Sequence, residues 1–339
     1  MQPGISTYVF FQHRLHAGLL DALAAAGART IEVFAARHHF DYTDAPAVRE
    51  LAAWFRSNDV RAVLHQPIYL LSEGGRDFTS ADAAQWSRHV APSLNLIALD
   101  KYHRIAAMDE VKRAIESAEQ VPFTAVVLHL GLKDAAWDEP AIERSLTAIE
   151  HLKAFAAPLG VRLLLQNLQN EVATPEHLLA ILKTGHFDTV GVCLDVGHLH
   201  LAQNASTASD PGAPSSAAAS SGVPSERSLL AGVESPPKVG SDSGVAAAVK
   251  LLGSRIAQVH LHDNHGAFAH VGALSNTVDN KDEHLWPGLG AIDWPAVSSA
   301  LATLPADTPG IMEAASDRDE PAESVARKAE EAFRVLANP

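Results

Sequence analysis

Histidine and carboxylate side chains recur where apolar segments of this chain end. The sequence has 18 histidines in 339 residues. One histidine at such a position is usually a core or surface residue, but a whole set brought together is costly to bury without a metal or substrate. Imidazole and carboxylate together suit Zn²⁺, Mn²⁺, Co²⁺ or Fe²⁺ better than Ca²⁺, so the pattern predicts a divalent-metal site. The polar residues at or just beyond the segment ends are His65, His129, Gln166, Asn167, Asp195, His198, His260, His262, Asp282, His284 and Glu313.

Eight short apolar segments alternate with stretches of helical spacing. Most are rich in Val, Ile, Leu or Phe without strict polar alternation, which is typical of parallel strands covered by helices. Eight such units predict a closed (β/α)₈ TIM barrel, in which the carboxyl ends of the strands meet at one mouth. An open doubly wound sheet is the alternative, but no glycine-rich phosphate loop follows the first segment. The predicted strands are Ile5–Phe10, Thr30–Phe34, Val60–His65, Thr124–Leu130, Val161–Asn167, Thr189–Asp195, Ile256–Leu261 and Gly310–Glu313.

One segment breaks this pattern. Residues 203–243 are dominated by Ala, Ser, Gly and Pro and show little apolar periodicity. We expect a flexible, low-complexity insertion after the sixth strand, within a single barrel domain that covers residues 1–339. Because it leaves the barrel on the catalytic face, it is either a disordered spacer or a lid over the site.

Composition limits the partners. The chain has 26 Lys and Arg against 40 Asp and Glu, and this acidic balance disfavours nucleic-acid binding. Cys193 is the only cysteine, which excludes an intrachain disulfide and fits a reducing compartment. No stretch reaches the roughly 18 apolar residues of a membrane span, and the first residues lack a signal peptide pattern. We therefore expect a cytoplasmic protein that binds a small molecule, with a homo-oligomer as a possible assembly.

Several motifs resemble the xylose isomerase-like barrel superfamily, which contains sugar isomerases, ketose epimerases, inositol-catabolic enzymes and the endonuclease IV group. They are His-Leu-Gly from His129, Leu-Asp-x-Gly-His around Asp195, His-Leu-His-Asp from His260, Pro-Gly-x-Gly-x-Ile-Asp-Trp ending at Trp294, and Glu313. The motifs span nearly the whole chain. They are specific for the superfamily but not for one activity within it.

The resemblance implies roles for individual residues. In sugar-handling members, one divalent ion (Mn, Zn or Co here) is bound by four residues that match Gln166, Asp195, His260 and Glu313. The catalytic residues implied are Glu313, His198 and His262. The substrate-binding residues implied are His65, His129, Asn167 and Trp294. Endonuclease-like members bind additional metal through positions that match His65, His129, His198, Asp282 and His284.

Gln166 departs from the family pattern, which has glutamate followed by asparagine at Gln166-Asn167. An amide offers a neutral oxygen where a carboxylate would bind the ion and could bridge two ions. In the epimerases that glutamate is also one of two acid/base groups. The substitution therefore predicts either weaker metal binding with the proton handled elsewhere, or a member with altered or no activity.

Three functions follow from these observations. The leading one is a divalent-metal-dependent isomerase or epimerase that acts on a sugar, keto-polyol or related small carbohydrate through an enediolate stabilised by the metal. The second is an endonuclease IV-like metal-dependent phosphodiesterase, favoured by the retained histidines and disfavoured by the negative charge and Gln166. The third is a non-catalytic barrel that binds sugar or metal.

Overall fold

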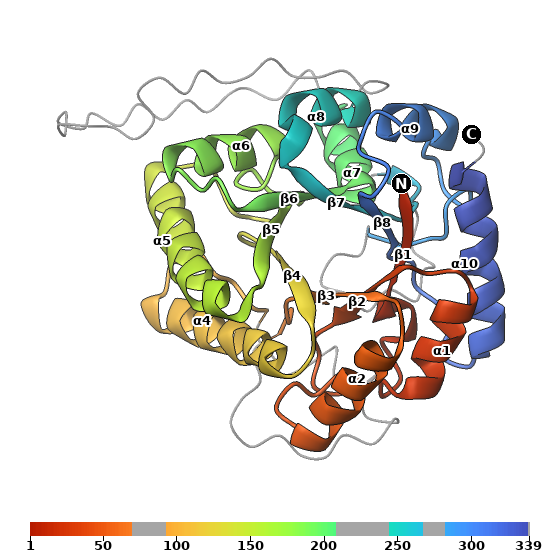
Figure 1. Cartoon of the computed structure of the whole chain (residues 1–339). Helices are drawn as coiled ribbons and strands as arrows, with labels where there is room; N and C mark the ends of the chain where they lie inside the picture. Colours follow the sequence, from red (N-terminus) through yellow and green to blue (C-terminus); the bar gives the residue numbers. More distant parts are fainter. Residues whose placement is uncertain (70–92, 208–243, 267–281, 338–339) are drawn as a thin grey trace, which may run out of the picture.

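Eight parallel strands form a closed barrel with helices around it (Figure 1). The computed structural model describes residues 1–69, 93–207, 244–266 and 282–337. Each strand pairs with the next along the chain, and β8 pairs with β1 to close the barrel. This confirms the predicted (β/α)₈ fold. The strands are β1 (Gln2–Ser6), β2 (Thr30–Phe34), β3 (Arg61–His65), β4 (Phe123–Leu128), β5 (Arg162–Gln166), β6 (Gly191–Asp195), β7 (Ile256–Leu261) and β8 (Pro309–Met312).

Seven of the strands lie within a few residues of their predicted positions, but the first was placed wrongly. The expected strand Ile5–Phe10 begins earlier, at Gln2, and ends at Ser6. There the Ser6 side chain accepts a hydrogen bond from the backbone N–H of Tyr8 and starts a short 3₁₀ turn, η1 (Thr7–Phe10). Such local side-chain bonds compete with strand pairing, which is why an apolar run alone misplaced this strand.

Capping side chains set where two of the helices begin. Thr174 and Asp293 cap α6 and α9 by accepting hydrogen bonds from His177 N and Ala296 N. Across the described residues, no helix has both the length and the hydropathy needed to cross a membrane. The helices are α1 (Ala17–Ala25), α2 (Ala45–Ser57), α4 (Lys101–Glu116), α5 (Glu139–Ala156), α6 (Pro175–Thr184), α7 (Val196–Thr207), α8 (Gly244–Leu252), α9 (Trp294–Leu301) and α10 (Ala322–Ala337).

The sequence pattern missed α7, which follows β6 without a loop. Residues 203–207, expected to open the insertion, belong to this helix. The rest of that segment, residues 208–243, lies outside the described residues. Because Asp195 ends β6 and His198 sits in the first turn of α7, the two polar groups face the same mouth.

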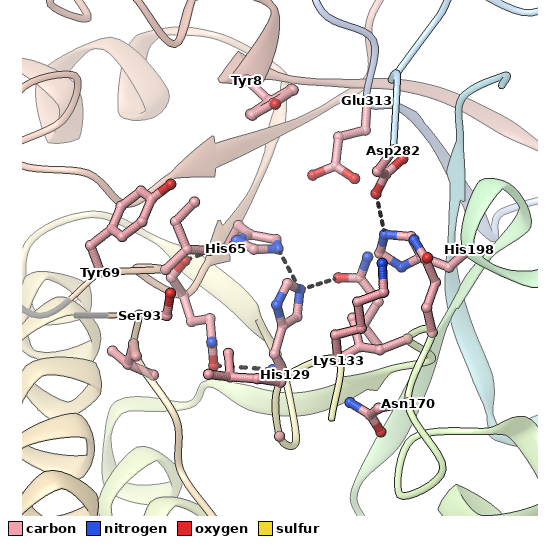
Figure 2. A pocket seen from close by; sticks show the side chains of 18 of the residues that line it. Tyr8, His65, Tyr69, Ser93, His129, Lys133, Asn170, His198, Asp282 and Glu313 are labelled. Carbon is pink, nitrogen blue, oxygen red and sulfur yellow. Dashed lines mark hydrogen bonds and ion pairs between the residues drawn. The ribbon is translucent and has the colours of Figure 1, made fainter. Parts of the chain in front are cut away.

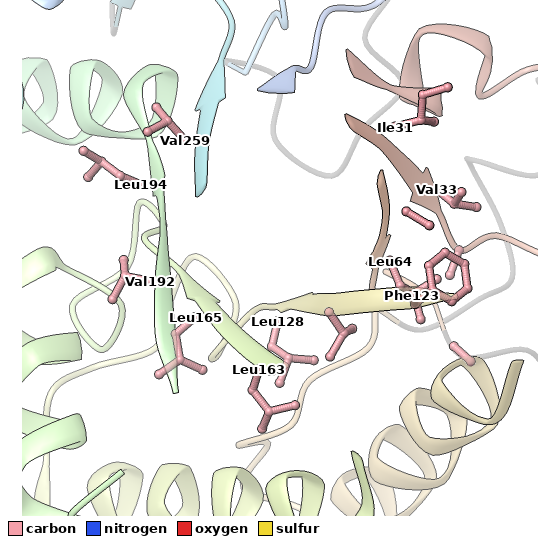
Figure 3. Packing of buried hydrophobic residues seen from close by; sticks show 14 of the residues in the cluster. Ile31, Val33, Leu64, Phe123, Leu128, Leu163, Leu165, Val192, Leu194 and Val259 are labelled. Atoms are coloured by element: carbon pink, nitrogen blue, oxygen red, sulfur yellow. The ribbon is translucent and has the colours of Figure 1, made fainter. Parts of the chain in front are cut away.

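Apolar packing occupies two layers. Val33 and Leu64 belong to the large cluster that joins the strands to the surrounding helices (Figure 3). A smaller cluster includes Val63, Val127 and Cys193. Cys193 is a fully buried free thiol, and burial raises its thiol pKa to about 11, so it packs as a small apolar residue.

Candidate active site

A cavity of about 210 Å³ opens over the carboxyl ends of the strands. Figure 2 shows His65, His129, His198, Asp282 and Glu313 arranged around it. In a (β/α)₈ barrel this is the face on which active sites form. The described residues that line the cavity are Tyr8, Phe34, His65, Gln66, Ile68, Tyr69, Ser93, Leu94, His129, Gly131, Leu132, Lys133, Gln166, Leu168, Gln169, Asn170, His198, Asp282, His284 and Glu313.

A chain of hydrogen bonds joins the ends of four successive strands. His65 Nε2 lies 3.2 Å from His129 Nε2, which lies 2.9 Å from Gln166 Oε1. The other end of the same amide, Gln166 Nε2, donates to Asp195 Oδ2 at 2.7 Å. Gln166 therefore lies between His129 and Asp195, with its oxygen engaged by an imidazole and its nitrogen by a carboxylate.

This network fixes which nitrogens of His65 and His129 carry hydrogen. His65 Nδ1 lies 2.8 Å from the backbone carbonyl of Gln66 and must donate to it. In the neutral ring, Nε2 is then a lone-pair acceptor that faces His129 and the cavity. Burial lowers the pKa of His129 to about 3, with His65 and His198 adding to the effect, so His129 is neutral at pH 7. Both rings can exchange hydrogen bonds with a hydroxyl group.

Asp195, His260 and Glu313 converge beside Gln166, as the sequence predicts. His260 Nδ1 lies 3.0 Å from Glu313 Oε2 and 3.7 Å from Asp195 Oδ2. These side chains are nearly or fully buried, and His260 Nδ1 has no hydrogen-bond partner among the described residues. A buried nitrogen without a partner beside two carboxylates is the arrangement that a cation would complete.

A second group of possible ligands lies beside the first. His198 Nε2 and His284 Nε2 lie 2.7 and 3.3 Å from Asp282 Oδ2. His262 lies between Asp195 Oδ1, at 3.1 Å, and Asp282 Oδ1, at 3.6 Å. One donor atom each from His198, His262, Asp282 and His284 fits within 4.8 Å of the others. The two groups share Asp195 as a neighbour.

The local backbone holds this second group in place. His284 has a positive φ of 46°, an uncommon conformation for a residue with a side chain. Its Nδ1 lies 2.8 Å from the carbonyl of Glu313, which directs Nε2 toward Asp282. At Gly197, in the first turn of α7, a Cβ would lie 2.1 Å from the His262 ring. Glycine therefore allows this imidazole to pack against the helix.

The buried carboxylates set the charge of the site. Burial alone lowers the pKa of His198, but Asp195 and Asp282 outweigh it and raise that pKa to about 10. In the same way, Asp282 and Glu313 overcome burial and raise the pKa of His284 to about 9. Burial would raise the pKa of Glu313, yet neighbouring histidines, led by His260, hold it well below its usual value. The metal-free site thus pairs ionised carboxylates with protonated imidazoles, and a dication could replace these protons.

Two residues expected to touch substrate lie elsewhere. Asn167 binds the backbone of Asp195 from both ends of its amide, at 2.9 and 2.7 Å. The indole N–H of Trp294 donates to Asp263 Oδ2 at 2.8 Å. Neither is among the described residues that line the cavity, because each side chain is committed to holding a neighbouring segment.

Sequence reasoning overlooked other residues of the site. Tyr8 and Lys133 line the cavity, and the Tyr8 ring packs 4.8 Å from that of His284. Glu32, in the middle of β2, contacts the far side of His260. A charged residue inside an apolar strand was the available signal for Glu32. Tyr8 gave none, because the strand before it was misplaced.

A family profile described as "Xylose isomerase-like TIM barrel" matches residues 20–337. The chain is also 25% identical over 118 residues to the uncharacterized protein MJ1311 of Methanocaldococcus jannaschii, covering 33% of this chain and 40% of that protein. It is 23% identical over 233 residues to the uncharacterized protein y4fM of Sinorhizobium fredii, covering 66% and 58%. The chain thus spans less than two thirds of either relative.

Solved structures match almost end to end. A D-tagatose 3-epimerase-like protein has a TM-score of 0.63 at 19% identity, covering 99% of this chain and 98% of the other. The IOLI protein with a bound zinc atom has a TM-score of 0.66 at 16% identity, with the same coverage. D-Psicose 3-epimerase from Clostridium cellulolyticum H10 has a TM-score of 0.62 at 14% identity, again covering 99% and 98%. At these identities the likeness concerns the fold. Because the family profile extends from the first helix to the last, this chain belongs to the xylose isomerase-like TIM barrel family.

Proposed function

We propose that this protein is a divalent-metal-dependent isomerase or epimerase of a small carbohydrate. The observation that carries the proposal is the buried meeting of Asp195, His260 and Glu313 at the ends of β6, β7 and β8, next to an open cavity. The unpartnered Nδ1 of His260 and the two adjacent carboxylates fit a divalent ion such as Zn²⁺, Mn²⁺ or Co²⁺. Gln166 Oε1 is a weaker, neutral candidate for a fourth donor.

A bound divalent ion would act as a Lewis acid toward neighbouring oxygens of the substrate. The chain's own groups would bind and reposition the remaining atoms. His65 and His129 face the cavity with complementary donor and acceptor nitrogens for a sugar hydroxyl. Glu313 is an ionised carboxylate in the cavity wall and would accept the proton from carbon. Its return of that proton to the neighbouring carbon would give isomerisation, whereas epimerisation would need a second group to deliver a proton to the opposite face. Gln166 cannot accept a proton, so we propose that Glu313 serves as the principal acid/base group.

The names of the structural neighbours support this substrate class. They include a D-psicose 3-epimerase and a 3-keto-D-glucoside 4-epimerase, while the zinc atom bound to the IOLI protein supports the metal. A cytoplasmic location and a homo-oligomeric state stay predictions of the sequence.

The test combines metal analysis with turnover. Purified protein would be analysed for bound metal, stripped, reloaded with Mn²⁺, Co²⁺ or Zn²⁺, and incubated with a panel of ketoses and keto-glycosides in D₂O. We expect about one tightly held ion per chain and deuterium incorporation at the carbon that is epimerised. Metal binding without deuterium exchange in any substrate would refute the epimerase and leave a phosphodiesterase or a non-catalytic binding protein.

The second ligand group favours one alternative, a phosphodiesterase of the endonuclease IV kind. His198, Asp282 and His284 could hold a further ion, and His65 and His129 could serve another. About three ions per chain and nicking of abasic DNA by the reloaded protein would support this alternative over the epimerase. Gln166 argues against it, because a neutral amide is a poor bridge between two dications.

A further inference from the structure

Glu32 is a buried carboxylate that the proposed chemistry does not use. It lies in the middle of β2 and is 0% exposed. Its Oε2 lies 2.9 Å from His260 Nε2 and 2.6 Å from Gln258 Nε2, although β2 and β7 are not neighbours in the barrel. These contacts therefore cross the interior of the barrel, directly beneath the proposed metal ligand.

We propose that Glu32, held by Gln258, is a positioning residue that orients His260 for metal binding. The inference rests on the proposed metal site at Asp195, His260 and Glu313. It assigns the imidazole a fixed tautomer, with hydrogen on Nε2 directed at Glu32 and a lone pair on Nδ1 directed at the ion.

The distances around the ring keep a hydrogen on Nε2. An Nε2 without hydrogen would point a lone pair at the Glu32 carboxylate from 2.9 Å, which is repulsive. The hydrogen must therefore sit on Nε2. By the same reasoning, Nδ1 carries a hydrogen in the metal-free protein, because it lies 3.0 Å from Glu313 Oε2. A dication would displace this proton, since Nδ1 is the nitrogen that faces Glu313 and Asp195 and has no hydrogen bond among the described residues. The lone pair freed in this way and the proposed metal position coincide.

Gln258 explains why Glu32 keeps its orientation. It lies two residues before His260 on β7, so both side chains leave the strand on the same face. Its amide nitrogen also lies 3.0 Å from His260 Nε2, which places two donors around the single oxygen Glu32 Oε2. That oxygen is thereby fixed as an acceptor. A carboxylate that accepts from a ligand imidazole orients the ring and makes its other nitrogen a better donor to a metal.

The ordinary alternative is that Glu32 only stabilises the barrel. Glu110 offers a matched control, because it is also buried, at 2% exposure, but accepts hydrogen bonds from Arg37 and Arg113 away from His260. Glu32→Gln and Glu110→Gln remove the same charge from two buried networks. Only the first should alter the metal site if Glu32 positions His260.

The experiment measures Zn²⁺ and Co²⁺ dissociation constants and the Co²⁺ visible spectrum in the full-length wild type and both variants. Circular dichroism of the metal-free proteins monitors folding. We expect Glu32→Gln to weaken metal binding about 10–100-fold and to shift the Co²⁺ bands, while Glu110→Gln leaves both unchanged. Equal affinities and spectra for the wild type and a folded Glu32→Gln would overturn the proposal.

A crystal structure of the zinc-loaded wild type tests the same point without any variant. Zinc on His260 Nδ1, with Nε2 within hydrogen-bond distance of Glu32, supports the proposal, and zinc on Nε2 overturns it. Neither readout depends on turnover. Loss of affinity in Glu32→Gln, together with no epimerase activity in the wild type, would support the positioning role and refute the proposed function.

Discussion

Replacing Gln166 by glutamate should strengthen metal binding and weaken the metal-free fold. In the metal-free protein, the amide nitrogen of Gln166 donates a 2.7 Å hydrogen bond to the ionised Asp195. The variant puts a second carboxylate in its place. With a dication present, the same carboxylate becomes an additional charged ligand. The substitution should therefore raise metal affinity and lower the stability of the metal-free protein.

Both magnitudes follow from the contact. A hydrogen bond to a charged group contributes about 1.5–3 kcal/mol. Its loss should lower the metal-free melting temperature by roughly 2–4 °C for each kcal/mol. In the loaded protein, a unit charge about 4 Å from a dication gains about 8 kcal/mol at an effective dielectric of 20, twice the value for two unit charges. Two costs offset most of this gain. The introduced carboxylate must be desolvated, and before metal binds it would share a proton with Asp195 that binding must remove. We therefore expect at least about tenfold tighter binding.

Titration of metal-free protein with Mn²⁺ and Zn²⁺, together with thermal unfolding in chelator, measures both effects. Gln169→Glu is the matched control, because it adds the same charge to the cavity wall without replacing a hydrogen bond to Asp195. It should change the dissociation constant much less. An unchanged or weaker dissociation constant in Gln166→Glu would refute the argument, since it would mean that residue 166 does not face the ion.

Three further predictions test the site. Asp195→Asn should abolish metal retention in elemental analysis while circular dichroism shows a folded barrel, and a full metal load in this variant would remove Asp195 from the ligand set. Metal binding should release protons, because neighbouring carboxylates raise the pKa of the proposed ligand His260 well above 6.5 and the pKa values of the adjacent His198 and His284 to about 10 and about 9. Metal affinity should therefore rise with pH between about 6.5 and 9. The protonated histidines also stabilise the metal-free fold. This stabilisation should be complete below pH 6.5 and should be lost as pH rises through 9 to 10. Calorimetry in buffers of different ionisation enthalpy measures the protons, and an enthalpy independent of buffer would contradict the prediction. Trp294→Phe should lower the free energy of unfolding by about 1–3 kcal/mol, because it removes the hydrogen bond to Asp263, and it should leave KM unchanged. A raised KM with an unchanged free energy of unfolding would instead make Trp294 a substrate contact.

The sequence determined the architecture and the convergence of most of the proposed metal ligands. Apolar segments buried on both faces alternate with helical patterns, and eight such units can close only by placing their carboxyl ends together. Asp195, His260 and Glu313 each stand at such an end, so their convergence could be predicted from the order of the strands. The fold thus turned positions that lie far apart in the sequence into neighbours.

Only the tertiary structure decided what each polar group contacts. Asn167 also stands at a strand end, yet its amide is used up by the backbone of Asp195, because hydrogen-bond partners depend on side-chain direction and not on spacing. Glu32 lies in mid-strand, where a sequence pattern places core residues. It meets His260 only because closure of the barrel brings β2 and β7 across a common interior, a contact over 228 residues that no local periodicity encodes.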